Sequence, residues 1–225
     1  MKVLAFYGSP RKGGNSEALL DAFLKGFGCR WPDGPGRSDW TPGVQSSMSE
    51  KPDGSGTAIL LDRVRAAELQ LSACRGCLGC LKTGMCVIDD GMTEMYRRLL
   101  AADLVVVSSP IFFYGLPSQM KAVIDRCQAL WCRKYFLKQQ MGNDRKGKAR
   151  RGVFLSVAGT KGKKVFDGAQ LTVRYFFDAI DVVFSDTLFF KKIDACGAIL
   201  DHPSALAEAA ELGQKVAAEG AVARG

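Results

Sequence analysis

The sequence predicts a doubly wound α/β domain built on a five-stranded parallel sheet. Its apolar runs are short and unbroken, which is typical of strands that are covered on both faces. Segments with helical spacing of apolar residues lie between those runs. The length of 225 residues fits one domain, and 47% apolar with 24% charged residues excludes a globally disordered chain.

Five apolar runs rich in β-branched residues are predicted to be the strands of this sheet. They are Val3–Phe6, Ile59–Leu61, Leu104–Val107, Val153–Leu155 and Val182–Phe184. Helical patterns follow them, and cap residues suggest where each helix opens. The predicted helices begin near Asn15 or Ser16, after Asp89 or Asp90, at Pro117, near Val165 and at Ser204. Five repeats of strand and helix favour the flavodoxin-like strand order 2-1-3-4-5, in a single domain over residues 1–225.

Residues 29–56 interrupt the alternation of strands and helices. Fourteen of these twenty-eight residues are Gly, Pro or Ser, so the segment is predicted to be a mobile or partner-facing loop. Because it joins the first helix to the second strand, we expect it at the edge opposite the carboxyl ends of the strands. Ligands of such sheets bind at the carboxyl ends, and the insertion is therefore given no catalytic role.

Neither a membrane nor a secretory leader is expected. The chain has no run of eighteen apolar residues, and the apolar stretch at its start ends at Gly8. The sequence therefore predicts a cytoplasmic protein whose thiols stay reduced.

The net charge of +8 is a local feature of the chain. Residues 133–151 contain eight basic residues and one acid, which gives +7 from that segment alone. We interpret it as a solvated surface and expect no nucleic-acid partner, since a nucleic-acid site would depend on this one segment. Lys161, Lys163 and Lys164 follow the fourth strand and are better placed to attract an anionic nucleotide or an acidic electron carrier.

A glycine-rich segment between the first strand and the first helix predicts an anion site. The segment is Gly8-Ser9-Pro10-Arg11-Lys12-Gly13-Gly14-Asn15-Ser16. A helix start offers unpaired N–H groups and a positive dipole end, and an arginine fork suits phosphate. The segment matches neither a Walker A loop nor a dinucleotide fingerprint. The alternative is a glycine-rich turn that binds nothing.

Three consecutive aromatic residues follow the third predicted strand, where a loop should be polar. They stand in Ser108-Ser109-Pro110-Ile111-Phe112-Phe113-Tyr114-Gly115-Leu116-Pro117. This loop could cup a planar isoalloxazine ring beside the phosphate site, or it could pack on a neighbouring subunit. A third loop, Ala158-Gly159-Thr160-Lys161-Gly162, could contact the polar edge of the ring.

The chain resembles the flavodoxin-like NADPH-dependent FMN reductases, and within them the iron–sulfur flavoproteins. The resemblance rests on G-S-P-R-x-G-G-N-S at Gly8–Ser16, S-P-I-F-F at Ser109–Phe113 and K-x-x-x-D-R at Lys121–Arg126, together with the cysteines discussed next. It implies noncovalent FMN, with its phosphate at Ser9, Arg11, Asn15 and Ser16. The ring would lie against Pro110, Ile111, Phe112 and Phe113. Lys12, Gly14, Tyr114, Gly115, Gly159 and Thr160 complete the expected cofactor-binding set. Phe112 departs from the family, which often has tyrosine there.

Four cysteines within thirteen residues predict a metal centre. Cys74, Cys77, Cys80 and Cys86 have the spacing C-x2-C-x2-C-x5-C. A run of three cysteines at every third residue is typical of iron–sulfur ligation, whereas structural zinc usually takes two separated pairs. No second run exists, so all four cysteines would serve one 4Fe-4S cluster. Zinc, a redox-active dithiol and reduced thiols remain alternatives.

These observations give three hypotheses. The first is an FMN-dependent oxidoreductase that passes electrons between a 4Fe-4S cluster and FMN, with a ferredoxin-like carrier or NAD(P)H as partner and a homodimer or homotetramer as assembly. The second is an NAD(P)H-dependent FMN or quinone reductase without a cluster. The third is a zinc-stapled module that binds nucleic acid. Because the cofactors carry the chemistry, no side chain is assigned as acid, base or nucleophile.

Overall fold

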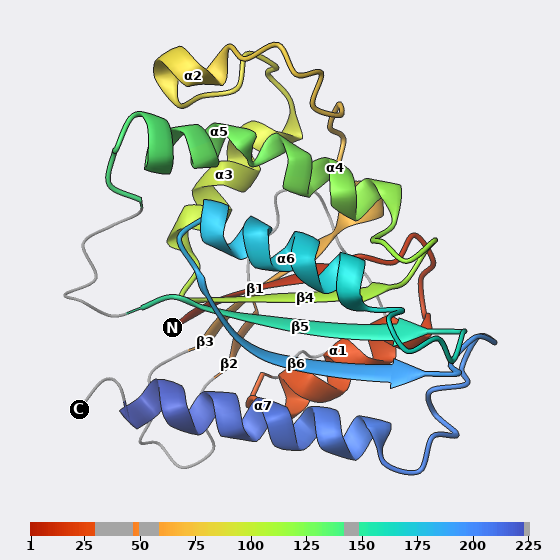
Figure 1. Cartoon of the computed structure of the whole chain (residues 1–225). Coiled ribbons are helices and arrows are strands. Elements are labelled where there is room, and N and C mark those ends of the chain that lie inside the picture. Colours follow the sequence, from red (N-terminus) through yellow and green to blue (C-terminus); the bar gives the residue numbers. More distant parts are fainter. Residues whose placement is uncertain (30–46, 50–58, 142–148, 223–225) are drawn as a thin grey trace.

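The predicted parallel sheet is present in the computed structural model, which describes residues 1–29, 47–49, 59–141 and 149–222. Five strands run parallel in the order β3-β1-β4-β5-β6, which is the predicted order 2-1-3-4-5 (Figure 1). The strands are β1 (Lys2–Tyr7), β3 (Ile59–Arg65), β4 (Leu104–Pro110), β5 (Arg151–Ala158) and β6 (Val183–Lys191).

The insertion adds one strand that the sequence did not indicate. β2 (Ser47–Ser49) pairs antiparallel with the first residues of β3, at the amino ends of the parallel strands. Without β2, the outer edge of β3 would leave its backbone groups unpaired there. The interpretation of 29–56 as a loop is therefore wrong at residues 47–49, and residues 30–46 and 50–58 lie outside the described residues.

Helices cover both faces of the sheet, as a doubly wound fold requires. α1 and α7 lie on one face, and α3, α4, α5 and α6 lie on the other (Figure 1). Their bounds are α1 (Asn15–Gly26), α3 (Gly91–Ala101), α4 (Ser118–Arg126), α5 (Gln128–Trp131), α6 (Asp167–Ala179) and α7 (Ala205–Val222). Shorter turns are η1 (Ala66–Glu68), α2 (Cys80–Thr83) and the π-helical η2 (Cys132–Phe136). Among the helices of the described ranges, none is long and apolar enough to cross a membrane.

Each face of the sheet has its own core, which explains the unbroken apolar runs. In β1, Val3 and Ala5 pack with α1 and α7, whereas Leu4 and Phe6 pack with the helices opposite. The last strand differs from this prediction. Val183, in the predicted run Val182–Phe184, is 56% exposed in β6, the edge strand of the sheet.

The third predicted helix is divided rather than continuous. α4 ends at Arg126, Cys127 follows, and α5 with η2 carries the chain onward to Phe136. The sequence predicts one apolar stripe on this helix, formed by Met120, Val123, Ile124, Cys127 and Trp131. Cys127 is buried in the core, as its place on this stripe predicts. Trp131, at the end of the same stripe, is 39% exposed because the division turns it away from the core.

Lys134 and Arg150, two residues of the basic segment, have partners within the fold. Lys134 forms ion pairs with Asp178 and Asp181. Arg150 is buried and donates to the carbonyl oxygens of Leu99, Ala102 and Ile180, at the carboxyl ends of α3 and α6. Cations at helix carboxyl ends are stabilised by the macrodipole. Such residues help to hold the fold together, and residues 142–148 lie outside the described residues.

Replacement of Gly26 by alanine is expected to destabilise the protein. In an open helix this change stabilises by about 1 kcal/mol. Here a Cβ on Gly26 would lie 2.0 Å from the carbonyl oxygen of Ala210 in α7, so α1 and α7 would have to separate. Overpacking of this kind costs about 1–3 kcal/mol or more. Urea unfolding measures the change, and equal or greater stability of Gly26→Ala would contradict the close helix packing.

Candidate functional site

The glycine-rich segment forms a tight turn against the end of β4. The N–H of Gly8 donates to the carbonyl oxygen of Ser108 over 2.8 Å. A Cβ on Gly8 would lie 2.9 Å from the Cβ of Ser109, so only glycine permits this approach. Gly13 has a φ of 64°, in the left-handed region that favours glycine. The turn leads directly into α1, whose first N–H groups point out of the helix and suit an anion.

A buried ion pair fixes this turn. The carboxylate of Glu17 accepts a hydrogen bond from the N–H of Gly13 over 2.9 Å and another from Nη1 of Arg65 over 2.8 Å. Both side chains are nearly inaccessible to solvent. Sequence reasoning missed this pair. The available signal was the position of Glu17 three residues after the helix cap, where a carboxylate can reach back to the preceding N–H groups.

Asn15, a predicted phosphate ligand, and Lys12, a member of the wider cofactor-binding set, use their side chains elsewhere. Asn15 donates from Nδ2 to the carbonyl oxygen of Ala195 over 2.8 Å, and its Oδ1 accepts from the N–H of Ile199 over 3.2 Å. Lys12 forms an ion pair with Glu68, with 2.6 Å between Nζ and Oε1. These side chains tie the turn to its neighbours, so Asn15 offers an anion its backbone N–H rather than its amide.

The aromatic loop is a tight hairpin at the same edge of the sheet. The backbones of Phe112 and Gly115 exchange hydrogen bonds of 2.9 Å in both directions. Phe113 and Tyr114 between them have φ values of 48° and 62°, and backbone strain in non-glycine residues is concentrated at functional sites. The Phe113 side chain is fully exposed, and Phe112 and Tyr114 are about half exposed. Exposed rings here suit either a flavin or a second subunit.

The third predicted loop adjoins the aromatic hairpin. A Cβ on Gly162 would lie 2.9 Å from Oη of Tyr114, so the phenol rests against this loop. Thr160 accepts from the N–H of Gly162 through its hydroxyl over 3.1 Å. Ser156 in β5 donates to the carbonyl oxygen of Ser109 in β4 over 2.7 Å, which fixes the two strand ends together. All three predicted loops therefore meet at the carboxyl edge of the sheet.

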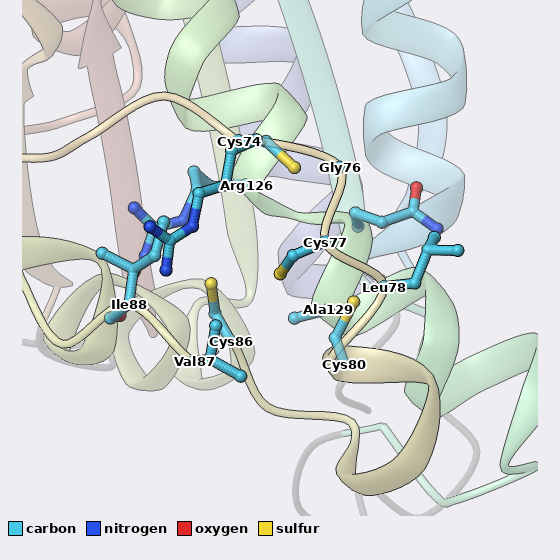
Figure 2. A pocket seen from close by; sticks show the side chains of 12 residues that line it. Cys74, Gly76, Cys77, Leu78, Cys80, Cys86, Val87, Ile88, Arg126 and Ala129 are labelled. Carbon is cyan, nitrogen blue, oxygen red and sulfur yellow. The ribbon is translucent and has the colours of Figure 1, made fainter.

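The four motif cysteines border one cavity. Its volume is about 410 Å³ with its open mouth included, and Cys74, Cys77, Cys80 and Cys86 all line it. Figure 2 shows the sulfur atoms of Cys74, Cys77 and Cys86 turned toward the space between them. In the described part of the chain, no group of three histidine, cysteine or acidic side chains is suited to a metal ion. Cysteine thiolates are the donors that iron–sulfur clusters take, so the donor type suits such a cluster although the described side chains do not form a metal-binding group.

A fifth thiol stands beside this set. The Sγ of Cys132 lies 3.6 Å from the Sγ of Cys80, and Cys132 is buried in η2. Burial and this neighbour raise the pKa of Cys80 to about 11. The sequence does not indicate Cys132 as a neighbour of this set, because fifty-two residues separate it from Cys80 and no local spacing links them.

Arg126 closes the neck of the cysteine segment. Its Nη1 donates to the carbonyl oxygen of Ser72 and to Asp90, each over 2.7 Å. Its Nη2 donates to the carbonyl oxygen of Ile88 over 3.1 Å and to Asp90 over 3.0 Å. Burial acts to raise the pKa of Asp90, but these hydrogen bonds and those from the N–H groups of Ser72 and Met92 lower it. We call Arg126, Asp90, Ser72 and Ile88 the Arg126 clamp.

The clamp explains two motifs that carried the resemblance. Arg126 ends K-x-x-x-D-R, and Asp90 follows the last cysteine. The structure makes them partners across the two ends of the cysteine segment. Asp90 also caps α3, as predicted, by accepting from the N–H of Met92 over 3.0 Å.

The cysteine segment leaves the carboxyl edge of the sheet, although it follows the second parallel strand. Figure 1 shows α2 and its flanking chain running over α5 and the carboxyl end of α4. The aromatic hairpin precedes the other end of α4, and nine helical residues span about 13 Å. The cavity and the carboxyl edge of the sheet therefore lie at opposite ends of this helix.

A second buried polar group lies next to the glycine-rich turn. The hydroxyl of Tyr7 donates to Oδ1 of Asp21 over 2.7 Å. Burial raises the pKa of Asp21 to about 6, although the hydrogen bond from Tyr7 acts to lower it. Burial and Asp21 also raise the pKa of Tyr7.

Comparison with known proteins identifies the protein family to which the chain belongs. The family model of NADPH-dependent FMN reductase matches residues 53–184. The chain belongs to this family.

The chain is also similar in sequence to curated proteins that are named iron–sulfur flavoproteins. A protein named iron–sulfur flavoprotein from Methanosarcina thermophila is 30% identical over 142 residues, which are 63% of this chain and 60% of the relative. Another of that name from Archaeoglobus fulgidus is 31% identical over 126 residues, which are 56% of this chain and 45% of the relative. The matched region thus spans only about half of these relatives' own length.

Solved structures confirm the fold. An NAD(P)H:quinone oxidoreductase from Methanothermobacter marburgensis has a TM-score of 0.61 at 13% identity and covers 96% of this chain and 98% of its own. An FMN-dependent NADH-azoreductase from Bacillus anthracis, solved with FMN, has a TM-score of 0.60 at 11% identity. The match covers 96% of this chain and 100% of the azoreductase chain.

Asp21 is expected to make stability depend on pH. The folded state binds the Asp21 proton more tightly than the unfolded state, since its pKa rises from 3.8 to about 6. The contribution of Asp21 to the free energy of unfolding is therefore fully present below pH 3.8. It falls by about 3 kcal/mol as the pH rises through about 6. Asp21→Asn should flatten this dependence in urea unfolding between pH 4 and 7. Asp201 is exposed, so Asp201→Asn serves as the control. If the stability of Asp21→Asn changed with pH as steeply as that of the wild type, the raised pKa of Asp21 would be contradicted.

Proposed function

We propose that the protein is an FMN-dependent oxidoreductase in which a 4Fe-4S cluster and FMN exchange electrons. One observation carries the proposal: the loops after β1, β4 and β5 meet at one edge, and the four motif cysteines border a separate cavity. FMN takes up a hydride or two electrons and releases electrons singly, whereas a cluster carries one at a time. Membership of the NADPH-dependent FMN reductase family supports the flavin half of this proposal.

The flavin half assigns a role to each loop. The N–H groups of Gly14, Asn15 and Ser16, the hydroxyl of Ser9 and the guanidinium of Arg11 bind the phosphate. The second loop receives the ring through the residues Pro110, Ile111, Phe112, Phe113, Tyr114 and Gly115. Gly159 and Thr160 border its polar edge. Lys12 contributes a positive field from its ion pair with Glu68 rather than a direct contact.

The cluster half rests on the donor set and on the relatives. Cys74, Cys77, Cys80 and Cys86 would hold the cluster, and all four border the same cavity. The printed names of the similar proteins from Methanosarcina thermophila and Archaeoglobus fulgidus support it. Reduced thiols are needed to load a cluster, so we assign the protein to the cytoplasm.

The electron partners belong to the proposal as well. NAD(P)H or a ferredoxin-like carrier would deliver electrons, and Lys161, Lys163 and Lys164 follow β5 at the edge where an anionic partner would approach. We include a homodimer or homotetramer, because the exposed aromatic hairpin offers an apolar surface to a second copy. Nucleic acid and membranes are not among the proposed partners.

The second candidate is an NAD(P)H-dependent FMN or quinone reductase that keeps the flavin and has no cluster. The family match favours it as much as the first candidate. The two candidate functions differ in whether the four motif cysteines hold a cluster.

Replacement of Arg11 by alanine is expected to weaken FMN binding about 10- to 100-fold, since charge-assisted hydrogen bonds contribute about 1.5–3 kcal/mol. Quenching of FMN fluorescence on titration into apoprotein measures the dissociation constant. Lys25→Ala, at the far end of α1, removes the same charge away from the turn and should leave the constant unchanged. Equal constants for Arg11→Ala and the wild type would remove Arg11 from the site.

The double variant Cys77→Ser/Cys80→Ser is expected to lose iron and sulfide while it retains FMN. Two of four ligands are removed from the cavity, and the flavin edge lies at the other end of α4. Iron, acid-labile sulfide and FMN are assayed after anaerobic purification. Cys196→Ser, which replaces an exposed cysteine outside the cavity, should retain iron and sulfide. Unchanged iron and activity in the double variant would favour the cluster-free reductase.

A further inference from the structure

The guanidinium of Arg126 has one donor left over. Its two Nη atoms donate four hydrogen bonds within the Arg126 clamp. Its Nε is buried and has no hydrogen-bond partner among the described residues. The Arg126 side chain is completely inaccessible to solvent. A buried charged donor without an acceptor is costly, and such an atom in a native structure calls for a partner that the protein chain does not supply.

The unpaired donor belongs to a side chain that lines the cysteine cavity. Arg126 borders this cavity together with all four motif cysteines. Figure 2 shows its side chain on the side of Cys74 and Cys86. Burial acts to lower the pKa of Arg126, but Asp90 raises it above the usual value, and Cys86 is among the groups that add to this effect. Cys86 is therefore close enough to Arg126 to interact with it electrostatically.

We propose that Nε–H of Arg126 donates a hydrogen bond to a sulfur of the cluster, either a cysteine thiolate or a bridging sulfide, and raises its reduction potential. The inference rests on the proposed function, since it needs the cluster in the cavity. Hydrogen bonds to cluster sulfurs withdraw negative charge and favour the reduced form.

The clamp makes Arg126 suited to this task. Four acceptors fix both Nη atoms, so the planar guanidinium cannot turn and the direction of Nε–H is set before any cluster binds. Asp90 offsets the positive charge within the same clamp. Lysine could keep a charge at this position but has no donor corresponding to Nε. Arg126 is thus a positioning residue for the cysteine segment and a tuning residue for the cluster.

The test compares Arg126→Lys with Asp90→Asn in anaerobically reconstituted protein. Iron and sulfide per chain are measured first, and the midpoint potential of the cluster follows from a titration monitored by electron paramagnetic resonance. Arg126→Lys keeps the charge and loses the Nε donor, so its potential should fall. Asp90→Asn removes a negative charge and keeps Nε, so its potential should stay equal or rise. A fully loaded Arg126→Lys protein with the wild-type potential would overturn the inference.

A second measurement keeps the inference testable if Arg126→Lys does not fold or load. The wild-type protein is labelled with ¹⁵N-arginine, and nitrogen coupling to the reduced cluster is recorded by pulsed electron paramagnetic resonance. Because Arg75 also lines the cavity, the same spectrum is recorded for Arg75→Lys. The coupling should persist there, and its absence would overturn the inference. A wild-type chain that retains FMN but takes up no iron and sulfide would overturn the cluster proposal itself, and this inference with it.

Discussion

The buried ion pair between Arg126 and Asp90 holds together the part of the molecule that the sheet does not organise. The cysteine segment contains few regular elements, and its two ends are joined by the Arg126 clamp and by a hydrogen bond from the N–H of Gly91 to the carbonyl oxygen of Gln70. Asp90 also caps α3 and Arg126 ends α4, so the same pair links the segment to two helices of the fold. Breaking one partner would leave a buried charge, which typically costs about 3–5 kcal/mol. The shape of the cysteine cavity therefore depends on this pair.

The flavin edge depends on a different constraint, the contact between the first turn and the end of β4. Gly8 lets the two backbones approach, and the buried pair of Glu17 and Arg65 fixes the turn from the other side. The aromatic hairpin then follows β4 directly and leads into α4. One helix thus connects the flavin edge to the cysteine cavity, which couples the positions of the two proposed cofactors through the fold.

The sequence predicted the sheet, its order and the helix starts, because unbroken apolar runs and cap residues are local signals. It also predicted which loops meet, because parallel strands bring their carboxyl ends to one edge. It did not reveal the partners of Asn15, Lys12 and Arg126, since pairs of side chains far apart in the chain leave no periodic pattern. The strained hairpin at Phe113 and Tyr114 was equally hidden, because neither residue type favours a positive φ. The sequence did not predict β2, because β2 lies in a segment whose composition indicates a loop.

The composition of the native protein tests the central claim most directly. Protein purified without oxygen should contain one FMN and one 4Fe-4S cluster per chain, and its visible spectrum should show the flavin bands above a broad iron–sulfur absorption. Material that contains FMN but neither iron nor sulfide, even after reconstitution, would contradict the cluster. Material that neither contains nor takes up FMN would contradict the whole account.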